Sequence, residues 1–475
     1  MEETWATLGV DLHLDTAVGE AAAAPGTGVR KGLTDALREA VRGGRLAPGT
    51  RLPSSRSLAV DLGIARNTVA DAYADLVAEG WLTARQGSGT RVADRPVPSP
   101  VKPPVSRARK STGPAYNLMP GTPDLASFPR TEWLKAARRA LAAAPNEAFG
   151  YGDPRGRVEL RTALADYLSR ARGVHADPDR IVICSGFAHG LMLLGAVLRG
   201  RGVRDIAVES YGLDAHWGIL SRAGLRTTPL ERDELGTHTG ELGGGGARFK
   251  AALLTPAHQF PMGVPLHPDR RAEAVDWARR TGGLILEDDY DGEFRYDRQP
   301  VGALQGLDPD HVVYLGTASK SLAPGLRLGW MVLPPRLVPE VLEEKGGSDW
   351  ACGAMDQLTL AEFLTSGAYD RHVRGARLRY RRRRDQLVAA LAERAPEVRA
   401  SGIAAGLHAV LRLPPGTERS VVQAASWQRL AVQGVSHFRH PRATVPDFDA
   451  LVVGYGTPAD HAWAGALEAL CRALP

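Results

Sequence analysis

The chain has 475 residues, which exceeds one ordinary domain and predicts two or three. An apolar fraction of 44% supplies a sizeable core, yet no run approaches the roughly 18 apolar residues of a membrane span, and the acidic first thirty residues lack the basic start of a secretory leader. We therefore expect a cytoplasmic protein without a membrane partner.

Three scattered cysteines, Cys184, Cys352 and Cys471, have the spacing of neither a metal site nor a disulfide framework, so we expect no bound metal. Their odd number also fits a reducing compartment. The net charge of +6 permits a nucleic-acid partner without demonstrating one.

The first 93 residues predict a short strand over residues 4–15, followed by three helices. Apolar residues recur at helical spacing over residues 28–42. Ser54 is a natural N-cap for a short second helix, which Gly63 ends. The third helix is expected from about residue 66 to residue 79.

Residues 80–92 predict a small hairpin with Gly87 near its tip. Three helices followed by a basic hairpin are the parts of a winged helix-turn-helix. In such a module the third helix begins in the major groove of DNA, where arginine can read guanine and asparagine can read adenine. Here that first turn carries Arg66, Asn67 and Thr68. A small helical domain with a solvated basic rim is equally compatible with the pattern.

Four segments of this region resemble the GntR family of bacterial winged-helix regulators. They are Leu52-Pro-Ser-Ser-Arg56-Ser-Leu-Ala, Gly63-Ile-Ala-Arg66-Asn-Thr68-Val, Leu76-Val-Ala-Glu-Gly-Trp-Leu and Gly87-Ser-Gly-Thr. The resemblance implies a double-stranded DNA operator as partner. By position it assigns DNA contacts to Arg56, Arg66, Asn67, Thr68 and Gly87.

Residues 94–115 are rich in proline and basic residues and have almost nothing to bury, which predicts an exposed, semi-extended linker. We therefore expect a winged helix-turn-helix DNA-binding domain over residues 1–93, with its core at 27–93. A large second domain is expected over residues 116–475.

Helical patterns alternate with short apolar runs beyond the linker. Helices are expected over residues 131–144, over residues 154–172 with Pro154 near the first position, and from the turn at residue 185 through Leu198. Strands are expected at residues 181–184, 206–209, 251–254, 284–286, 312–315 and 330–333. This order predicts an α/β fold whose mostly parallel sheet is covered on both faces and binds ligands at the carboxyl ends of its strands.

A hydroxyl-rich turn between the last two of these strands holds one lysine, Lys320. An amine becomes a nucleophile towards a carbonyl when burial or a neighbouring cation lowers its pKa. Thr317 and Ser319 supply hydroxyl groups, and Arg327 supplies a planar fork suited to a phosphate. An aldehyde cofactor with a phosphate group would satisfy both features. A solvated lysine beside an ion-paired arginine is the alternative, and this stretch alone leaves it open.

Two further segments add to this pattern. The turn after residue 184 offers free backbone donors to a phosphate at a helix N-terminus, from Gly186, Phe187 and Ala188. The strand at residues 284–286 ends in acidic residues, of which Asp288 could keep a pyridine nitrogen protonated, while Tyr290 could bond the phenolic oxygen of the ring. An acidic cluster alone would also fit a divalent metal or a cap. Together with the lysine and the arginine, these groups supply what pyridoxal phosphate (PLP) requires.

Five segments of the large domain resemble the fold-type I aminotransferase domain of the MocR subfamily, which includes the GabR and PdxR regulators and joins such a domain to a GntR-type head. They are Tyr151-Gly-Asp-Pro-Arg-Gly156, Thr255-Pro-Ala-His-Gln-Phe-Pro-Met-Gly263, Glu287-Asp-Asp-Tyr-Asp-Gly-Glu-Phe-Arg-Tyr296, Gly316-Thr-Ala-Ser-Lys-Ser-Leu-Ala-Pro-Gly-Leu-Arg327 and Phe363-Leu-Thr-Ser-Gly-Ala-Tyr-Asp-Arg-His372. The resemblance covers residues 27–475.

The resemblance implies PLP as cofactor. It makes Lys320 the lysine that binds the aldehyde, Asp288 the acid at the ring nitrogen and Tyr290 the partner of the ring oxygen. It also implies a homodimer, because aminotransferase domains of this type build their sites at a dimer interface. The resemblance also assigns the phosphate group of PLP to Thr317, Ser319 and Arg327.

Two positions depart from the pattern of the subfamily. Where the subfamily usually has Glu-x-Pro-Gly-Tyr, with an aromatic ring that stacks on the cofactor, this chain moves the aromatic residue to Tyr211, so the stacking residue stays open. Where the subfamily commonly has an arginine that grips the carboxylate of the effector, this chain has Val452. We therefore expect either an effector other than a simple amino acid, such as PLP itself, or a grip by Arg439 or Arg442.

The leading interpretation is a transcription regulator whose large domain senses PLP or a small amine and thereby changes operator binding. The alternative is a PLP-dependent aminotransferase whose DNA-binding head only localises the enzyme. A third interpretation keeps DNA binding and makes the large domain a dimerisation scaffold that has lost its cofactor. The sequence also leaves open whether His258 neighbours the cofactor or belongs to the core. The basic run at residues 377–384 could meet DNA, a partner subunit or solvent.

Overall fold

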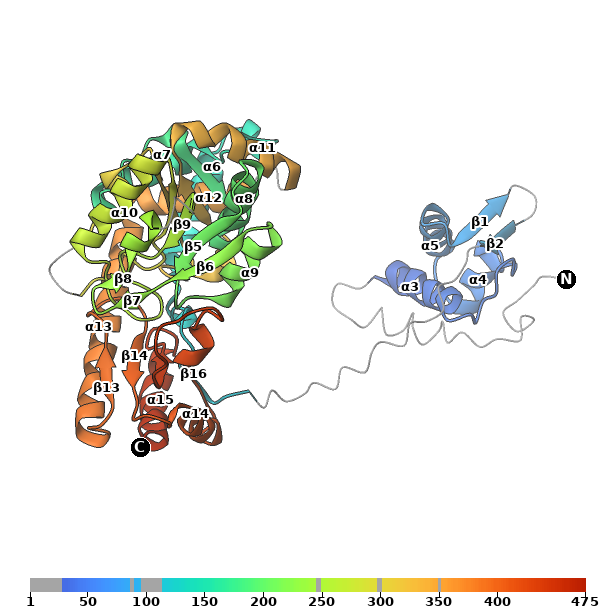
Figure 1. Ribbon diagram of the computed structural model, residues 1–475. Helices are drawn as coiled ribbons and strands as arrows, with labels where there is room; N and C mark the ends of the chain where they lie inside the picture. The colour runs from blue at the N-terminus through green and yellow to red at the C-terminus, as the bar shows by residue number, and fades with distance from the viewer. Residues whose placement is uncertain (1–27, 86–88, 95–112, 245–248, 297–300, 349–351) are drawn as a thin grey trace. The chain divides into compact units, whose positions relative to one another are not determined.

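The computed structural model describes residues 28–85, 89–94, 113–244, 249–296, 301–348 and 352–475 (Figure 1). The chain divides into two units, residues 1–112 and 113–475, and each is described by itself. The strand expected over residues 4–15 and the predicted DNA contact Gly87 lie outside the described residues. Among the described helices, none combines the length and the apolar character that a membrane crossing requires.

The first unit contains the three predicted helices and the predicted hairpin. The helices are α3 (Val29–Arg42), α4 (Ser55–Leu62) and α5 (Arg66–Ala78), and the strands are β1 (Leu82–Arg85) and β2 (Gly89–Val92). The two strands pair antiparallel.

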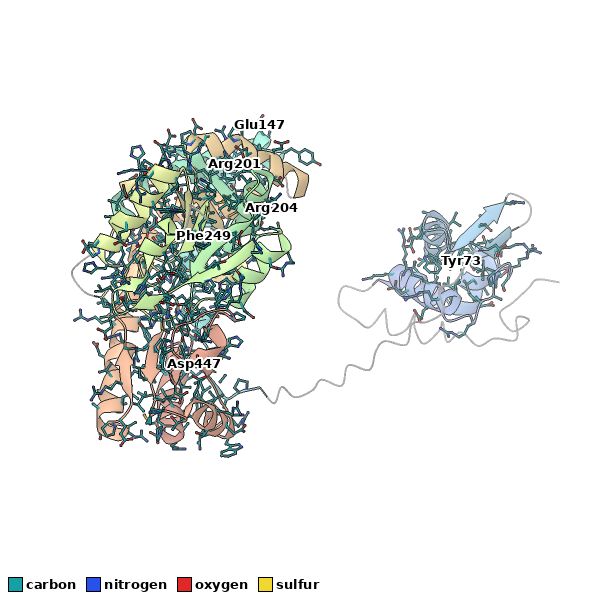
Figure 2. All side chains as sticks on the ribbon, viewed as in Figure 1. Tyr73, Glu147, Arg201, Arg204, Phe249 and Asp447 are labelled. Atoms are coloured by element: carbon teal, nitrogen blue, oxygen red, sulfur yellow. The ribbon has the colours of Figure 1, made fainter. Side chains whose placement is uncertain are left out.

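The core of this small unit is apolar and fully enclosed. Leu33, Leu37, Leu58 and Val69 are wholly buried where the helices meet. The Tyr73 hydroxyl, labelled in Figure 2, donates a hydrogen bond of 3.1 Å to the Pro53 carbonyl oxygen and so ties α5 to the segment before α4. The head therefore has a core of its own.

The N-terminus of α4 depends on one serine. The Ser54 hydroxyl oxygen accepts a hydrogen bond of 3.1 Å from the Ser57 backbone N–H, which has no partner inside the helix. We expect Ser54→Ala to lower the free energy of unfolding of the head by about 1 kcal/mol, measured by calorimetry of the full-length protein. Ser55→Ala is the matched control, because Ser55 makes no such capping bond. Equal unfolding of the two variants would contradict this role of Ser54.

A seven-stranded sheet forms the centre of the second unit (Figure 1). Its strands, in spatial order, are β4 (Ile181–Cys184), β12 (Gly329–Val332), β11 (Val312–Thr317), β10 (Leu284–Asp288), β9 (Ala251–Leu254), β5 (Asp205–Glu209) and β6 (Arg226–Leu230). All run parallel except β12, which is antiparallel to both of its neighbours. The predicted mostly parallel sheet is confirmed.

Helices cover both faces of this sheet, as its apolar strands predict. They are α6 (Arg130–Ala143), α7 (Val158–Arg172), α8 (Phe187–Gly200), α9 (Asp214–Arg222), α10 (Pro268–Thr281), α11 (Val338–Ser348) and α12 (Ala354–Thr365). Successive residues of β11 alternate between the faces: Val313 and Leu315 pack in the cluster of α8, α9 and α11, whereas Tyr314 packs in the cluster of α7 and α12.

The C-terminal part of the second unit contains a smaller antiparallel sheet. Its strands, in spatial order, are β13 (Arg399–Ser401), β14 (Ala409–Arg412), β17 (Ala450–Val453) and β16 (Gln433–Gly434). The helices that share its core are α13 (Ala368–Arg394), α14 (Glu418–Trp427) and α15 (Asp460–Ala473). Two short pairs complete the strands: β3 (Tyr116–Asn117) with β15 (Leu430–Ala431), and β7 (Arg232–Asp233) with β8 (Gly236–Thr237).

The predicted start of the helix over residues 154–172 is wrong. The helix α7 begins at Val158, and Pro154 lies in the turn before it. Gly156 has φ of +100°, which a helix cannot contain, and a Cβ atom there would come within 2.5 Å of the Ile183 side chain. The close approach of this turn to β4 therefore delays the helix.

The predicted end of the strand at residues 284–286 is also wrong. Strand β10 continues through Glu287 and Asp288, which pair with β11 and are buried. Glu287 pairs with both β9 and β11, and Asp288 pairs with β11, and this pairing outweighs the low strand preference of the two acidic residues. As a consequence, Asp288 is held by the sheet.

Candidate functional site

A cavity of about 380 Å³ lies at the carboxyl ends of the central strands. The last residues of three strands contribute to its wall, Glu209 of β5, Asp288 of β10 and Thr317 of β11. This is where open α/β sheets place their ligands. The predicted cofactor residues that line the cavity are Phe187, Asp288, Tyr290, Thr317, Ser319 and Lys320.

The Lys320 ammonium group is held at the wall of this cavity. Its Nζ atom donates a hydrogen bond of 2.6 Å to the carbonyl oxygen of Gly121. Burial lowers the pKa of Lys320, and the carboxyl groups of Asp288 and Asp291 oppose that shift. The environment therefore favours the neutral amine more than water does, which is what a nucleophilic lysine requires.

Asp288 carries an oxygen atom without a partner. Its side chain is buried, and Oδ1 makes no hydrogen bond to any described residue. Burial raises the pKa of Asp288 well above its ordinary value, although Lys320 opposes this shift. A buried oxygen that lines a cavity and lacks a donor is suited to a protonated nitrogen of a ligand.

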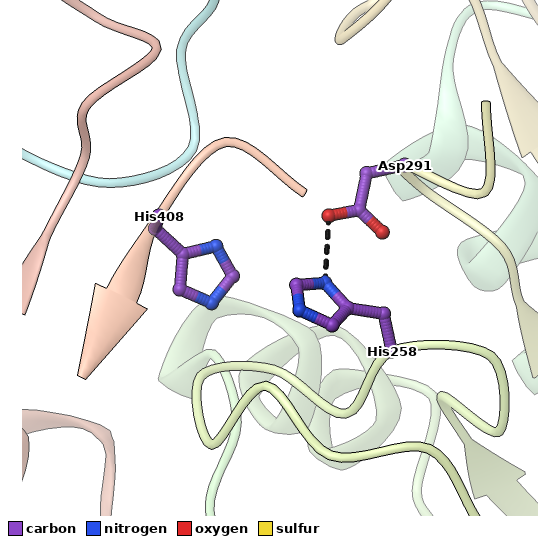
Figure 3. Close-up of side chains that lie close together, drawn as sticks. All are labelled: His258, Asp291 and His408. Atoms are coloured by element: carbon purple, nitrogen blue, oxygen red, sulfur yellow. Dashed lines mark hydrogen bonds and ion pairs between the residues drawn. The ribbon is translucent and has the colours of Figure 1, made fainter. Parts of the chain in front are cut away.

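Tyr290 lies beside a buried group of polar side chains, and Figure 3 shows the three of them that are His258, Asp291 and His408. Its hydroxyl donates a hydrogen bond of 3.0 Å to the backbone oxygen of His258 and lies 3.1 Å from Nδ1 of the same histidine. That Nδ1 atom also lies 2.8 Å from Oδ2 of Asp291, and the His408 ring lies 5.2 Å from the His258 ring. His258 is not among the residues that line the cavity. It lies beside Tyr290, which does line it.

Of the predicted phosphate residues, Arg327 lies against the turn that begins α8. Gly186 has φ of +85°, and a Cβ atom there would lie 3.3 Å from Nη1 of Arg327. Arg327 is exposed and donates a hydrogen bond to the backbone oxygen of Ser185. The hydroxyl oxygens of Thr317 and Ser319 lie 2.8 Å apart. Gly186, Ala188 and Arg327 stand outside the cavity lining, but Phe187, which lies between the first two, lines the cavity and places this turn beside it.

The cavity residues that were not predicted from the sequence include Gly121, Glu209 and His216. Gly121 contacts Lys320 from a segment 199 positions away, and no sequence signal marks it. Glu209 ends β5, and burial raises the pKa of its carboxyl group to about 7. His216 packs its ring against Phe187 with a centroid distance of 4.6 Å. A histidine one turn into the helix after β5 is a signal that could have pointed to it.

No arginine is among the described residues that line the cavity. Val452 is wholly buried in β17. Arg439 donates hydrogen bonds of 2.9 and 2.8 Å to the backbone oxygens of Ala443 and Val445. Its guanidinium is thereby engaged within its own loop, and the exposed Arg442 does not line the cavity either.

Glu293, in the segment after β10, predicts a pH effect on stability. Burial raises the pKa of this carboxyl group from 4.5 to about 7, and the Tyr369 hydroxyl donates to it at 3.2 Å. As pH rises through this window, the unfolded chain releases the proton first, so the folded state loses stability. At pH 4, where both states carry the proton, we expect Glu293→Gln and wild type to have the same melting temperature. At pH 8 we expect the melting temperature of Glu293→Gln to be about 2 °C or more above that of wild type.

The matched control is Glu132→Gln, because Glu132 is exposed and its pKa is lowered by Lys135. At pH 8 the melting temperature of Glu132→Gln should not exceed that of wild type. A Glu293→Gln melting temperature that follows wild type at every pH would contradict the assignment.

The predicted DNA-contacting residues lie on the surface of the first unit. Arg56 of α4, and Arg66 and Asn67 in the first turn of α5, are exposed, and Thr68 is half-buried. Neither Arg56 nor Arg66 makes an ion pair with a described residue. Other arginines of this unit, by contrast, are paired: Arg30 with Asp75 at 2.8 Å and Arg38 with Glu79 at 2.9 Å. The exposed arginines of α4 and α5 are thus available to a partner.

Two family profiles match the chain. "Bacterial regulatory proteins, gntR family" matches residues 30–92, and "Aminotransferase class I and II" matches residues 116–447. The chain is 34% identical to the HTH-type pyridoxine biosynthesis transcriptional regulator PdxR of Corynebacterium glutamicum, over 87% of this chain and 89% of that protein. It is 32% identical to the probable rhizopine catabolism regulatory protein MocR of Rhizobium meliloti, over 75% of this chain and 76% of that protein.

The large unit is also similar to solved aminotransferases. An archaeal alanine:glyoxylate aminotransferase superposes with a TM-score of 0.69 and 25% identity, over 77% of this chain and 91% of that chain. The predicted fold class, a winged helix-turn-helix head with a fold-type I α/β domain, is confirmed. The chain belongs to the GntR family of bacterial regulatory proteins, in the group of DNA-binding transcriptional regulators, with PdxR and MocR, that carry an aminotransferase class I and II domain.

Proposed function

We propose that this regulator binds PLP in its large unit and that the bound cofactor, or a small amine bound with it, changes the affinity of the head for its operator. The observation that carries the proposal is the pairing of Lys320 and Asp288 in one cavity. The lysine has a lowered pKa, and the acid has a buried oxygen without a partner. These are the groups that the aldehyde and the ring nitrogen of PLP require.

The residues present fit the whole cofactor. Lys320 would bind the aldehyde, Asp288 the ring nitrogen and Tyr290 the ring oxygen. PLP supplies an electrophilic aldehyde and an electron-withdrawing ring. The phosphate would be held by Arg327, the hydroxyls of Thr317 and Ser319, and the helix start at Gly186, Phe187 and Ala188.

The effector should not be a simple amino acid held by its carboxylate. The described cavity lining contains no arginine, and Arg439 is engaged elsewhere. We therefore propose PLP itself, or an amine without a carboxylate grip, as the effector. The test is a titration of the absorbance of the lysine-bound cofactor with α- and γ-amino acids. Tight binding of any of them would contradict this proposal, and transfer of the amino group would favour the aminotransferase alternative.

A homodimer in the cytoplasm is the expected form of the protein. The large unit leaves several large apolar side chains exposed, and a second copy that covered them would remove their apolar surface from water. They include Leu134 and Leu141 on α6, Phe149 and Tyr151 in the segment after α6, and Met192 on α8. Sedimentation velocity of the full-length protein tests the proposal, and a monomer at micromolar concentration would contradict it.

Arg66 should carry a large share of operator recognition. It begins α5, is exposed and has no ion pair among the described residues. We expect Arg66→Ala to weaken operator binding by about 1–3 kcal/mol, measured by fluorescence anisotropy with labelled duplex DNA. Lys31→Ala, which removes an exposed charge from α3, is the matched control. Equal affinity of the two variants would show that α5 does not read the operator.

A further inference from the structure

A second hollow of about 420 Å³ lies in the large unit, between α7, the segment after β10 and α13. It shares no lining residue with the cofactor cavity. We call it the arginine hollow, because its charged lining consists of Arg170, Arg172, Arg295, Arg374, Arg377 and Asp370.

Two of these arginines are neutralised by carboxylates. Arg170 lies 2.9 Å from Asp370, one helical turn before Arg374 on α13. Arg172 is buried and lies 2.7 Å from the buried carboxylate of Asp289. Neither pair leaves net charge in the hollow.

Two others, Arg374 and Arg377, keep their charge. Arg377 donates hydrogen bonds of 3.0 and 2.7 Å to the backbone oxygen of Glu293, an uncharged acceptor. Arg374 is exposed and makes no hydrogen bond or ion pair with any described residue. The two lie three positions apart on α13, so their side chains share one face of the helix. Among the described lining residues, no carboxylate therefore balances the guanidinium charge of Arg374 and Arg377.

The position of these arginines distinguishes them from an ordinary basic helix face. Arg381 and Arg382 are exposed on the same helix but do not line the hollow. In a concave site the field of several like charges is focused, and an anion that enters relieves their mutual repulsion. Guanidinium forks are suited to the oxygens of a phosphate.

We propose that the arginine hollow binds a small phosphate-bearing anion, with Arg374 and Arg377 as its principal contacts. Its volume lies in the range of sites for small ligands, about 300–1,000 Å³. A hollow of about 420 Å³ admits a small anion but not a DNA duplex. Binding of the anion does not depend on the function proposed for the cofactor cavity, whereas its linkage to PLP rests on that function.

The hollow and the cofactor cavity share one loop. Residues 289–293 accept hydrogen bonds from Arg172 and Arg377 on the side of the hollow, at Asp289, Gly292 and Glu293. The same loop follows Asp288 and carries Tyr290, which line the cofactor cavity. An anion that draws these arginines towards itself would act on that loop. By linkage, the anion and PLP should change each other's affinity by the same factor.

The test is calorimetric titration of the full-length protein with inorganic pyrophosphate, with and without saturating PLP. We expect one pyrophosphate per chain in both cases. The double variant Arg374→Gln/Arg377→Gln should bind it about tenfold more weakly or worse. The matched control, Arg381→Gln/Arg382→Gln, removes the same charge from the same helix outside the hollow and should bind within about twofold of wild type.

Several outcomes would overturn the proposal. They are the absence of pyrophosphate binding by wild type, equal affinity in the two double variants, and full competition by PLP, which would place the anion at Arg327. Loss of operator affinity in Arg374→Gln/Arg377→Gln, without pyrophosphate binding by wild type, would assign these arginines to DNA. Arg374→Gln alone keeps the test decisive if the double variant unfolds, because Arg374 has no described partner to lose.

Discussion

Lys320→Ala is expected to abolish the visible absorbance of lysine-bound PLP and to weaken PLP binding by about 100-fold or more, because only non-covalent contacts then remain. Asp288 would also lose the cation that faces it and opposes the rise of its pKa. Absorbance spectra and equilibrium dialysis of the purified protein measure the two effects.

The control for this variant is Lys135→Ala. Lys135 is exposed on α6 and, among the described residues, forms its ion pair with Glu132, at 2.8 Å. Its removal should leave both the absorbance and the affinity for PLP unchanged. Visible absorbance that persists in Lys320→Ala and disappears in Lys135→Ala would show that the cofactor lysine has been misassigned.

Leu37→Ala should unfold the DNA-binding head while the large unit stays folded. Leu37 is wholly buried in α3, and truncation of a buried leucine costs about 2–5 kcal/mol. A domain as small as this head has little more stability than that. We expect calorimetry to show that the unfolding transition of the head moves to a lower temperature or disappears. Operator binding should be lost and PLP binding retained.

Val60→Ala is the control for Leu37→Ala. Val60 lies on α4 of the same unit, but the residue is 77% exposed, so its truncation should change stability little. Operator binding that survives Leu37→Ala at physiological temperature would contradict the account of the head core.

Local signals in the sequence were sufficient for the head. Ser54 caps α4 and Gly63 ends it in the left-handed conformation, as their residue types predict. The first turn of α5 was placed correctly because its apolar residues follow helical spacing. These features depend on neighbours within a few positions, which a sequence displays directly.

Features set by distant segments were predicted less well. The late start of α7 follows from the close approach of Gly156 to Ile183, and the extension of β10 follows from pairing with two other strands. Neither cause lies within the segment that it changes. Sequence patterns therefore predicted the existence of both elements but not these boundaries.

The candidate site shows the same division. Lys320 and Asp288 were predicted from the sequence because Lys320 lies in a recognisable turn after β11 and Asp288 lies in a recognisable acidic run at the end of β10. The hydrogen bond from Lys320 to Gly121 and the place of His258 beside Tyr290 required the fold. The arginine hollow required it too, because its residues come from three separate segments.

The most direct test of the central claim is an anisotropy titration of operator DNA, selected by the protein from a random duplex pool, with wild type and with Lys320→Ala. Each titration is made with and without PLP. We expect PLP to change the operator affinity of wild type by about fivefold or more and to leave that of Lys320→Ala unchanged. An operator affinity of wild type that is the same with and without PLP would contradict the account.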